Sequence, residues 1–335
     1  MPTRAKPRFH EPLVAWYQQG HRALPWRETT DPYRLWLAEV MLQQTTVAAV
    51  LPYYQRFLAA FPTVHALAAT PLPRVLELWQ GLGYYRRAHL LHRCAQVVVA
   101  EHGGEFPTTE AALLKLPGLG AYTAAVVAAC AFNQPTTVID GNVLRVVARV
   151  KALTPPLTPT HKALRAAAAA LCTEAPPRLY ANAIMELGAT VCTPTNPRCV
   201  VCPVQTHCRA FAQGNSTAYP SKVAKPPLPY KHGVAYVLRD AGGALYLRQR
   251  PATGLLGGLW EVPHTGWENT PVPPLPEAQT EAGSLTHTFT HFKLTLEVRL
   301  ATVSHIPPPH RFLPSALPPL SSLMRKVLCT AGLPT

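Results

Sequence analysis

The sequence predicts a mainly α fold with a smaller α+β domain at its C-terminal end. The 335 residues are too many for one small core, so two or three domains are expected. Apolar residues recur with helical spacing as far as Phe132 and again after Asp140, whereas alternation with a period of two begins beyond residue 230. With 48% hydrophobic and 14% charged residues, the composition is that of a globular chain.

The helical part begins with a clear helix start. Asp31 can cap a first turn and Pro32 fits the first helical position, so a helix is expected from there to Met41. Apolar periodicity between turn residues predicts further helices, which are listed here by residue number: 47–61, 63–69, 71–79, 84–102, 143–151, 161–172 and 180–190.

The last third of the chain changes in composition and period. Residues 213–229 are rich in Ser, Pro and Lys and predict a linker. Beyond it, alternating apolar residues predict strands at 234–238, 244–248 and 287–303. Apolar residues with helical spacing then predict a closing helix at 320–329. This part of the chain is therefore expected to form a separate α+β domain.

The charge balance points to a polyanionic partner. Lys and Arg outnumber Asp and Glu by 31 to 17, which gives a net charge of +14. Nucleic acid is the first expectation and an anionic membrane surface is the second. The sequence has no apolar run long enough to span a membrane, and its first nine residues are basic and contain proline without a following apolar core. A cytoplasmic, nucleoid-associated protein is therefore expected.

Two glycines in the sequence Leu-Pro-Gly-Leu-Gly predict a tight connection between two helices. Gly118 and Gly120 stand where a positive φ or a close backbone approach requires glycine. The amides that open the next helix can then bind an anion such as a DNA phosphate. The alternative is an ordinary turn between two helices. The carboxylate of Asp140, which follows the second helix, favours the DNA-binding interpretation.

A second acidic residue, Glu39, stands alone in a hydrophobic helix. It could be a solvated residue on the outer face of that helix. If it instead lies near apolar walls, its pKa is raised and it can remain protonated to act as a general acid. Glu39 and Asp140 would then form a site of two carboxylates with different roles, as in glycoside hydrolysis generally.

Four cysteines cluster near the end of the helical part: Cys192, Cys199, Cys202 and Cys208. In a chain that is not exported, this clustering predicts a metal site rather than disulfides. Zinc sites usually have two close cysteine pairs, whereas here only Cys199 and Cys202 are closely spaced, which favours a cubane iron–sulfur cluster over zinc. The other four cysteines are expected to be small buried side chains: Cys94, Cys130, Cys172 and Cys329.

These motifs together resemble a known family. The sequences LPGLGAYT and VIDGNV resemble the helix-hairpin-helix superfamily of base-excision DNA glycosylases, and WLAEVMLQQT resembles its MutY-type adenine-specific members. The resemblance implies that Glu39 protonates the departing adenine at N7 and later activates water. It implies that Asp140 faces the sugar of the flipped-out nucleotide and stabilises the oxocarbenium ion. Asn142 and Glu186 would be supporting residues, although both could equally be structural.

The resemblance extends to the cysteine spacing, which is similar to the cluster loop of endonuclease III and MutY-type glycosylases. It implies a [4Fe–4S] cluster with a structural role, in a loop that would hold Arg198, His207 and Arg209 against phosphate. The implied domains are an iron–sulfur helical domain at 1–27 and 133–212, a six-helix domain at 28–132, the linker at 213–229, and a C-terminal domain at 230–335.

Tyr122 indicates the reaction class within this family. The resemblance implies that relatives which also cut the DNA backbone carry a Schiff-base lysine at this position of the hairpin helix. This chain has a tyrosine there, so a monofunctional glycosylase is expected. The hydroxyl of Tyr122 would lie near the carboxylates.

The resemblance also implies residues that contact DNA. Something must fill the gap left by a flipped-out base, and aromatic stacking makes Tyr84 a suitable filler. The wedge and opposite-base contacts in the family correspond to Gln44, Thr45, Leu82 and Tyr84, and the adenine pocket corresponds to Trp26 and Arg27.

The C-terminal residues resemble a Nudix-type α+β domain through RQRP at 248–251 and GGLWEVP at 257–263. A hydrolase of that fold needs an Arg-Glu-x-x-Glu-Glu helix to hold magnesium, but no arginine lies between Arg250 and Arg299. The acidic residues have the wrong spacing for that helix: Glu268, Glu277 and Glu281. This domain is therefore expected to read DNA rather than to act as a second enzyme.

A short segment within this domain, Phe289, Thr290 and His291, resembles the Phe-Ser-His loop with which MutY-type proteins recognise 8-oxoguanine. We expect it on a strand; the alternative is an edge strand with polar residues outward. Threonine replaces the usual serine, so the hydroxyl is retained.

Together these features predict a monomeric adenine DNA glycosylase that acts on double-stranded DNA with adenine opposite 8-oxoguanine or G. The alternatives are an endonuclease III-like glycosylase acting on thymine or oxidised pyrimidines, and a non-enzymatic iron–sulfur protein that only binds DNA. Relatives of the endonuclease III type have a similar run but lack the acid at position 39, which disfavours the first alternative.

Overall fold

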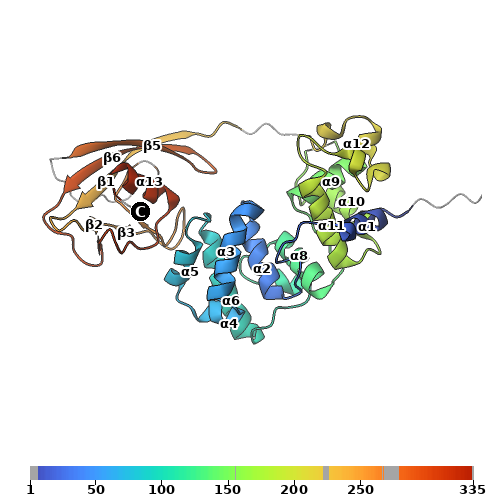
Figure 1. Cartoon of the computed structure of the whole chain (residues 1–335), viewed down its shortest axis with the longest axis horizontal. Helices are drawn as coiled ribbons and strands as arrows, with labels where there is room; N and C mark the ends of the chain where they lie inside the picture. Colours follow the sequence, from blue (N-terminus) through green and yellow to red (C-terminus); the bar gives the residue numbers. More distant parts are fainter. Residues whose placement is uncertain (1–6, 155, 222–225, 266, 268–278, 334–335) are drawn as a thin grey trace, which may run out of the picture. The chain divides into compact units, whose positions relative to one another are not determined.

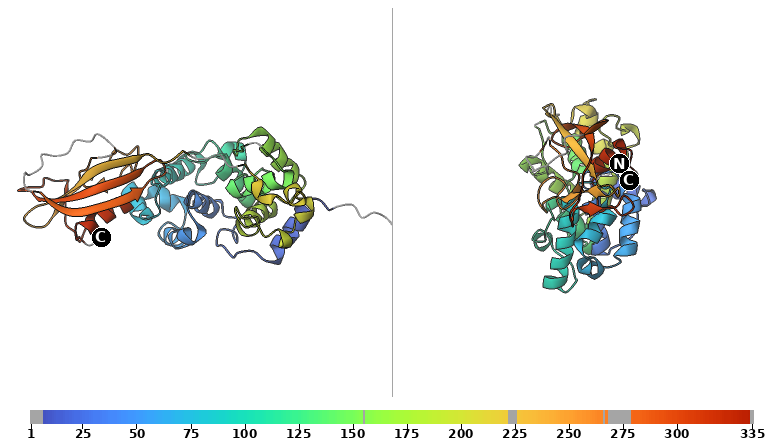
Figure 2. Two further views of the ribbon diagram at one scale, coloured as in Figure 1. Left: turned by 90° about the horizontal axis from the view of Figure 1, so that it is seen from above. Right: turned by 90° about the vertical axis from the view of Figure 1, so that its left-hand side faces the viewer.

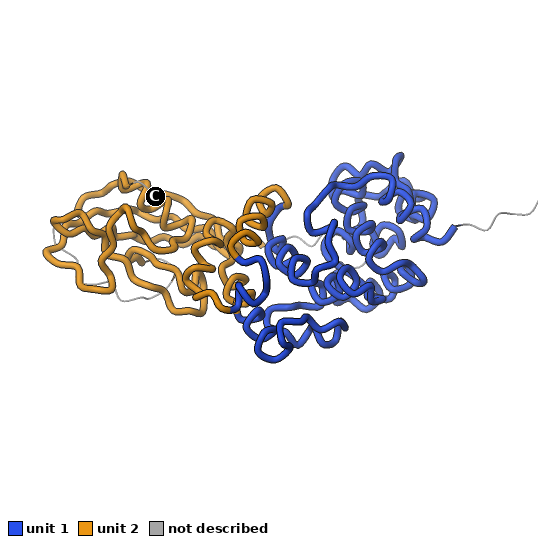
Figure 3. The backbone as a smooth tube through the Cα atoms, turned by 60° about the horizontal axis from the view of Figure 1, so that its bottom comes forward, with its two compact units in different colours: residues 1–46, 61–68, 93–224 blue, residues 47–60, 69–92, 225–335 orange. Residues whose placement is uncertain are grey.

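The fold was analysed in a computed structural model, which describes residues 7–154, 156–221, 226–265, 267 and 279–333. The chain forms two compact units (Figure 3). Unit 1 contains residues 1–46, 61–68 and 93–224, and unit 2 contains residues 47–60, 69–92 and 225–335. Unit 2 thus combines the C-terminal residues with residues 47–60 and 69–92 of the predicted six-helix domain. The predicted domain boundaries stay a prediction.

Unit 1 is helical, and one of its apolar cores joins α1 to α9, α10 and α11. Phe9, directly before α1, and Leu13 on α1 pack there with Val147 on α9, Leu164 on α10 and Ile184 on α11 (Figure 1). The α-helices of unit 1 are α1 (His10–Gln19), α2 (Pro32–Leu42), α4 (Val64–Ala69), α7 (Glu110–Leu113), α8 (Ala121–Phe132), α9 (Gly141–Lys151), α10 (Lys162–Cys172), α11 (Pro177–Thr190) and α12 (Arg209–Ala212). Its short 3-10 turns are η1 (Cys199–Val201), η2 (Gln205–His207) and η3 (Ser216–Ala218).

Unit 2 combines helices with a mixed sheet. Its helices are α3 (Val47–Ala60), α5 (Leu72–Trp79) and α13 (Ser322–Thr330), and it includes the first part of α6 (Arg86–His102), whose second part belongs to unit 1. The five-stranded sheet has the order β5-β6-β1-β2-β7, and β3 pairs with β4 separately. The strands are β1 (Tyr230–Arg239), β2 (Leu245–Tyr246), β3 (Arg248–Gln249), β4 (Trp260–Glu261), β5 (Thr280–Thr288), β6 (Lys293–Thr302) and β7 (Arg311–Phe312).

The sheet of unit 2 is built on two long pairings. β1 runs parallel to β6 over its whole length, from Tyr230 opposite Lys293, and β5 runs antiparallel to β6 (Figure 2). Because side chains alternate along a strand, β6 buries Leu294, Leu296 and Val298 on one face, where the apolar side of α13 covers them. This packing gives the domain its α+β character.

The sequence predicted this fold class correctly. A mainly helical chain with a C-terminal α+β domain is confirmed, and the helices α2 to α6 begin and end close to their predicted bounds. The helix α11 begins at Pro177 rather than at residue 180, and β1 extends beyond 234–238 on both sides. Within the part of the chain that the structure describes, no helix is long and apolar enough to cross a membrane.

The predicted strand at 287–303 was wrong in one respect. The chain forms two strands there, β5 and β6, joined by a turn in which the amide of Phe289 donates to the carbonyl oxygen of Phe292 at 2.9 Å. Phe289, Thr290 and His291 therefore lie in a turn and not on a strand. Two of the acids considered above, Glu268 and Glu277, lie outside the described residues.

Candidate active site

Glu39 lies in the interior of unit 1 because α2 is buried around most of its circumference. The helix begins as predicted, since Oδ1 of Asp31 accepts a hydrogen bond from the amide of Tyr33 at 2.9 Å and Pro32 occupies the first turn. Residues 35–41 are all buried, and α2 packs against α8. Glu39 itself is only 5% exposed. The alternative of a solvated residue on the outer face is therefore excluded.

The environment of Glu39 favours its protonated form. Burial raises the pKa of its carboxyl to about 7, and the charge of Asp140 acts in the same direction. A hydrogen bond from Tyr122 and the charge of Arg27 oppose this shift only in part. Oε2 of Glu39 is buried without a hydrogen-bond partner among the described residues. The carboxyl can thus carry a proton near neutral pH and has an oxygen available for a bound molecule.

Asp140 is held differently, at the N-terminus of α9. Its Oδ1 accepts a hydrogen bond from the amide of Val143 at 2.6 Å, and its Oδ2 accepts one from Nδ2 of Asn142 at 2.9 Å. These bonds cap the helix, whose N-terminus favours a negative charge. The structure therefore fixes both oxygens of Asp140 from one side and brings its charge near Glu39.

A hydrogen-bonded chain continues from Asn142 toward the cysteine segment. Nη2 of Arg145 donates to Oδ1 of Asn142 at 2.9 Å and to the carbonyl oxygen of Gly188 at 2.7 Å, while its Nε donates to the carbonyl oxygen of Cys192 at 2.7 Å. A Cβ at Gly188 would lie 2.6 Å from Cβ of Asn142, so glycine is required there. Asn142 therefore connects the carboxylate to the start of the cysteine segment, and Arg145 is a residue that the sequence did not indicate.

Tyr122 stands in the first turn of α8, beside Glu39. Its hydroxyl lies 3.4 Å from Sδ of Met185 and within hydrogen-bond reach of Glu39, and its single proton can be donated to one of the two at a time. Burial and the two nearby carboxylates raise the pKa of Tyr122 well above its ordinary value, so it is a neutral phenol. The side chain can orient Glu39 and has no amine with which to attack a sugar.

The glycine connection before α8 leaves the helix N-terminus open. Gly118 adopts a φ of +77°, which favours glycine, whereas Gly120 has a φ of −88° and caps the helix without a side-chain bond. The expectation that intramolecular geometry requires glycine at both positions was therefore wrong for Gly120, where a Cβ would meet no atom within 4 Å. That open space, with free amides in the first turn of α8, suits a phosphate.

A buried ion-pair group lies between α11 and the segment that precedes α2. Glu186 is 1% exposed and pairs with Nη2 of Arg27 at 2.7 Å and with Nη2 of Arg22 at 2.6 Å. Although burial pushes the pKa of Glu186 upward, hydrogen bonds from Arg22 and Arg27 bring it below its ordinary value. Trp26 is buried next to Arg27. Sequence reasoning missed Arg22, because its partner is 164 positions away.

Two of the predicted DNA-contacting residues follow α2 directly. Gln44 is exposed and adopts a φ of +62°, and the amide of Thr45 donates to the carbonyl oxygen of Leu42 at 3.3 Å. Both residues belong to the turn that ends the helix of Glu39. A tight turn thus places a glutamine side chain in solvent at the end of the helix that carries Glu39.

Two predicted residues that are far apart in the sequence meet in unit 2. The hydroxyl of Tyr84 and the hydroxyl of Thr290 are hydrogen-bonded at 2.8 Å, and either can be the donor. Tyr84 is 46% exposed, whereas Leu82 in the same turn is buried. The structure therefore joins the turn before α6 to the turn between β5 and β6.

The two neighbours of Thr290 differ from each other in burial. Phe289 packs against the core of unit 2, with its ring 4.7 Å from those of His287 and Phe292 and 6.2 Å from that of Trp267. His291 is exposed. Phe289 thus anchors the turn, while the side chains of Thr290 and His291 remain accessible.

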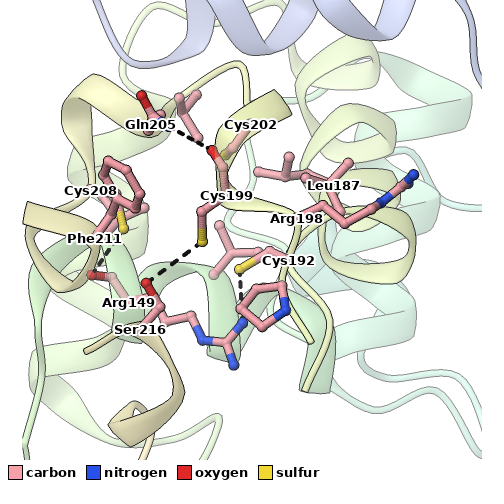
Figure 4. A pocket seen from close by; sticks show the side chains of 15 residues that line it. Arg149, Leu187, Cys192, Arg198, Cys199, Cys202, Gln205, Cys208, Phe211 and Ser216 are labelled. Carbon is pink, nitrogen blue, oxygen red and sulfur yellow. Dashed lines mark hydrogen bonds between the residues drawn. The ribbon is translucent and has the colours of Figure 1, made fainter. Parts of the chain in front are cut away.

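The four clustered cysteines line one apolar pocket in unit 1, together with Val146, Leu187 and Phe211 (Figure 4). Nη1 of the buried Arg149 donates to Sγ of Cys192 at 3.3 Å. None of these cysteines is in a disulfide. The pocket therefore gathers the four thiols as the spacing predicted: Cys192, Cys199, Cys202 and Cys208.

The arrangement of the thiols bears on which metal they could hold. A single tetrahedral zinc ion requires four ligands at about 2.3 Å from one point. Four thiolates are also the ligand set of a [4Fe–4S] cluster, and the four cysteines that line this pocket could supply it.

Of the three residues of this segment that were expected to face phosphate, Arg198 already has a hydrogen bond within the protein. Arg198 is exposed, and its Nη2 donates to the carbonyl oxygen of Thr190 at 2.7 Å, whereas Arg209 is exposed and His207 is half-buried. Of the isolated cysteines, Cys94 and Cys130 are buried as expected. Cys172 is half-buried and Cys329 is exposed, so the expectation of a fully buried side chain was wrong at both positions.

Comparison with known proteins identifies two family matches. Residues 37–174 match the family of HhH-GPD superfamily base excision DNA repair proteins, and residues 234–329 match the NUDIX domain. The first match contains Glu39, Tyr122 and Asp140, and the second contains Thr290.

Curated relatives of this chain include adenine DNA glycosylases. The adenine DNA glycosylase of Homo sapiens is 37% identical over 87% of this chain and 66% of its own length, so the chain spans about two thirds of that relative. The adenine DNA glycosylase of Rattus norvegicus is 35% identical over 92% of this chain and 73% of its own length. Among solved structures, a thermostable thymine-DNA glycosylase is 29% identical with a TM-score of 0.56, and covers 61% of this chain and 95% of its own.

Proposed function

Because this chain belongs to the adenine DNA glycosylase family of the HhH-GPD superfamily, we propose that it removes adenine paired with 8-oxoguanine or G from double-stranded DNA. The reaction hydrolyses the N-glycosidic bond and leaves an abasic site in an intact strand. The observation that carries the proposal is the pair of carboxylates, of which the buried Glu39 has a pKa raised to about 7 while Asp140 is held by two donors.

The two carboxylates have the properties that such a hydrolysis needs. Adenine leaves more readily when it is protonated. Oε2 of Glu39, which has no hydrogen-bond partner in the part of the chain that the structure describes, can deliver a proton to N7 of a base bound in the interior. Loss of the base leaves positive charge on the sugar, which the carboxylate of Asp140 can stabilise. Glu39, ionised after the transfer, can then accept a proton from the attacking water.

The adenine pocket that we propose is bounded by Trp26 and Arg27. The carboxylate of Glu186 forms an ion pair with the guanidinium of Arg27, so the guanidinium is fixed before an adenine base binds. The proposed monofunctional reaction is supported by Tyr122, because a phenol beside the sugar cannot form a Schiff base.

Recognition of the opposite base is proposed for the exposed turns. Thr290 and Tyr84 present hydroxyls at one place in unit 2, and a hydroxyl can donate to or accept from an altered base edge. Phe289 and His291 flank that hydroxyl on the same turn. Gln44, Thr45 and Leu82 are proposed as the further contacts to the strand opposite the excised base.

We propose that the pocket of four cysteines holds a [4Fe–4S] cluster. When bound, the cluster would crosslink the segment from Cys192 to Cys208 and thereby stabilise it. Arg149 and Arg145 then connect that segment to α9, whose N-terminus carries Asp140. Hydrogen bonds thus connect the cluster segment to the catalytic carboxylate within one unit.

The proposed function is tested by incubating the protein with four duplexes, which carry A opposite 8-oxoguanine, A opposite G, T opposite G, and a thymine glycol. We expect alkali-labile sites in the first two duplexes only, without strand breaks at neutral pH and without trapping by borohydride. Excision of T or thymine glycol would instead support a glycosylase for thymine or oxidised pyrimidines. Binding without excision of any base would support a non-enzymatic DNA-binding protein.

We further propose that the protein acts as a monomer in the cytoplasm, in association with the nucleoid. Its net charge of +14 supports association with DNA. Sedimentation with and without duplex DNA measures the oligomeric state.

A further inference from the structure

The turn of residues 81–84 presents Tyr84 in an unusual backbone conformation. Gly81 and Gly83 have φ values of +97° and +75°, which glycine adopts easily, but Tyr84 has a φ of +48°. A positive φ is unfavourable for a residue with a large side chain, so contacts from the surroundings must hold it. The side chain of Tyr84 nevertheless has a defined direction, because its hydroxyl is hydrogen-bonded to that of Thr290.

Arg87, one turn along the chain, supplies such contacts. Its Nη2 donates to the carbonyl oxygens of Leu82 and Gly83 at 3.3 and 3.2 Å. Its guanidinium carbon lies 5.2 Å from the ring centre of Trp79 and 5.6 Å from that of Tyr84. Arg87 is only 7% exposed, and although burial lowers its pKa to about 10, the guanidinium stays charged at neutral pH.

The indole ring of Trp79, against which Arg87 packs, is itself held in place by its surroundings. Trp79 is fully buried, packs edge-on against Phe57 at 5.6 Å, and donates from Nε1 to the carbonyl oxygen of Gly83 at 2.9 Å. The amide of Arg87 donates to the carbonyl oxygen of Tyr84 at 2.8 Å. The cation is thus held between two aromatic rings while it satisfies two carbonyl oxygens of the turn.

We infer that Arg87 is a positioning residue for recognition of the base opposite the excised adenine: its guanidinium fixes the turn so that Tyr84 and Thr290 present their hydroxyls together. This inference rests on the proposed function. A planar guanidinium is suited to this place, because it donates in a fixed plane and stacks on rings, whereas an ammonium does neither in the same way. Arg87→Lys therefore keeps the charge and removes the geometry.

The neighbouring Arg86 offers a matched control, since it is exposed in the same turn of α6. In the full-length protein, single-turnover excision is measured at one salt concentration for A opposite 8-oxoguanine and for A opposite G. We expect Arg87→Lys to lower the ratio of the two rates by about fivefold or more, the low end for one hydrogen bond to a base edge. Arg86→Lys should leave the ratio within about twofold of the wild type.

Two further measurements separate positioning from general stability. Combined with Tyr84→Ala, Arg87→Lys should lower the ratio no further than Tyr84→Ala alone, because both act on one side chain. Amide hydrogen exchange of the peptide covering residues 80–87 should accelerate in Arg87→Lys and remain unchanged in Arg86→Lys, in protein without DNA.

An unchanged ratio in Arg87→Lys, or a loss that adds in full to that of Tyr84→Ala, would overturn the inference. If Arg87→Lys does not fold, Arg87→Gln replaces it, and failure of both to fold would also overturn it. If the wild type removes no adenine from any duplex, the proposed function fails, and the exchange comparison still decides whether Arg87 orders the turn.

Discussion

The carboxylates of unit 1 and the exposed turns of unit 2 contrast in how their polar groups are held. Glu39 is 5% exposed and keeps one oxygen without a hydrogen-bond partner among the described residues, while Asp140 receives two hydrogen bonds from its own helix start. Tyr84 is 46% exposed, and its hydroxyl bonds that of Thr290 in the DNA-free protein. The acid of the first region is buried, whereas the hydroxyls of the second region lie at the surface.

The difference fits the two tasks that we propose for these regions. A general acid near neutral pH needs a raised pKa, and burial away from water supplies it. A reader of base edges must reach its ligand, so its hydroxyls have to be accessible and able to change partner. The hydroxyls of Tyr84 and Thr290 can each donate or accept, so either can exchange its protein partner for a base edge.

Replacing Cys199 should have the largest effect, because it removes one of four ligands from the proposed cluster of unit 1. We expect the wild-type protein to be brown, and Cys199→Ala to lose the broad visible absorption, together with solubility and DNA binding. The control is Cys329→Ala, which removes an exposed cysteine outside the pocket. A colourless, active wild-type protein with stoichiometric zinc would refute the cluster.

Glu39→Gln tests the buried region directly. The amide keeps the shape of the side chain and cannot donate the proton, so excision should fall by at least about 10²-fold, the low end for a positioned acid. DNA binding should remain nearly intact. Glu101→Gln, at an exposed position of α6, is the control for loss of one carboxylate. Excision by Glu39→Gln within tenfold of the wild type would contradict the assignment.

The pH dependence of excision tests the same carboxyl without mutation. Burial raises the pKa of Glu39 to about 7, so the acid is present below that pH and is lost as the pH rises through it. Single-turnover rates should therefore fall about tenfold per pH unit above 7. The free energy of unfolding should fall between about pH 4.5 and 7 and level off above pH 7, because in that interval the folded state holds this proton and the unfolded chain has lost it. A rate independent of pH between 7 and 9 would argue against Glu39 as the acid.

Much of the fold could be predicted from local patterns. Helix starts such as Asp31-Pro32 and apolar periodicity gave the bounds of α2 to α6 because both signals lie within one element. The turn after β5 could not be predicted in this way. The alternation in His287-Thr-Phe-Thr-His291 continues through the turn without glycine or proline, so the pattern resembles one long strand.

The residues of the candidate site also differ in whether local sequence could predict them. Glu39 and Asp140 stand in segments whose residue types indicate their chemistry, and the four cysteines do so by spacing alone. Arg22, Arg87 and Arg145 carried no signal, because an isolated arginine in a sequence shows neither its burial nor its partners. Their roles depend on tertiary contacts, such as that of Arg22 with Glu186 across 164 positions.

Recognition by unit 2 is best tested by a point substitution. Deleting residues 226–335 would remove the larger part of a compact unit, in which Nε2 of Gln80 donates to the carbonyl oxygen of Leu320 at 3.0 Å and Nε2 of His89 lies 3.0 Å from the carbonyl oxygen of Gly257. Such a truncation would expose buried surface on the helices that remain. Any loss of preference would then be difficult to separate from unfolding.

Thr290→Ala should have the smallest effect of these changes, because it removes one exposed hydroxyl and leaves the anchor Phe289 in place. We expect the preference for A opposite 8-oxoguanine over A opposite G to fall by about fivefold, since a hydrogen bond to one base edge discriminates by roughly 1–3 kcal/mol. Thr290→Ser retains the hydroxyl and should retain the preference, and Thr288→Ala removes an exposed hydroxyl at the end of β5 as the control. Rates are measured in single turnover at fixed salt, because phosphate contacts make affinity depend on salt. If the preference is unchanged in Thr290→Ala, the contacts of unit 1 at Gln44 and Thr45 would have to read the lesion, and the contrast between a catalytic unit and a reading unit would fail.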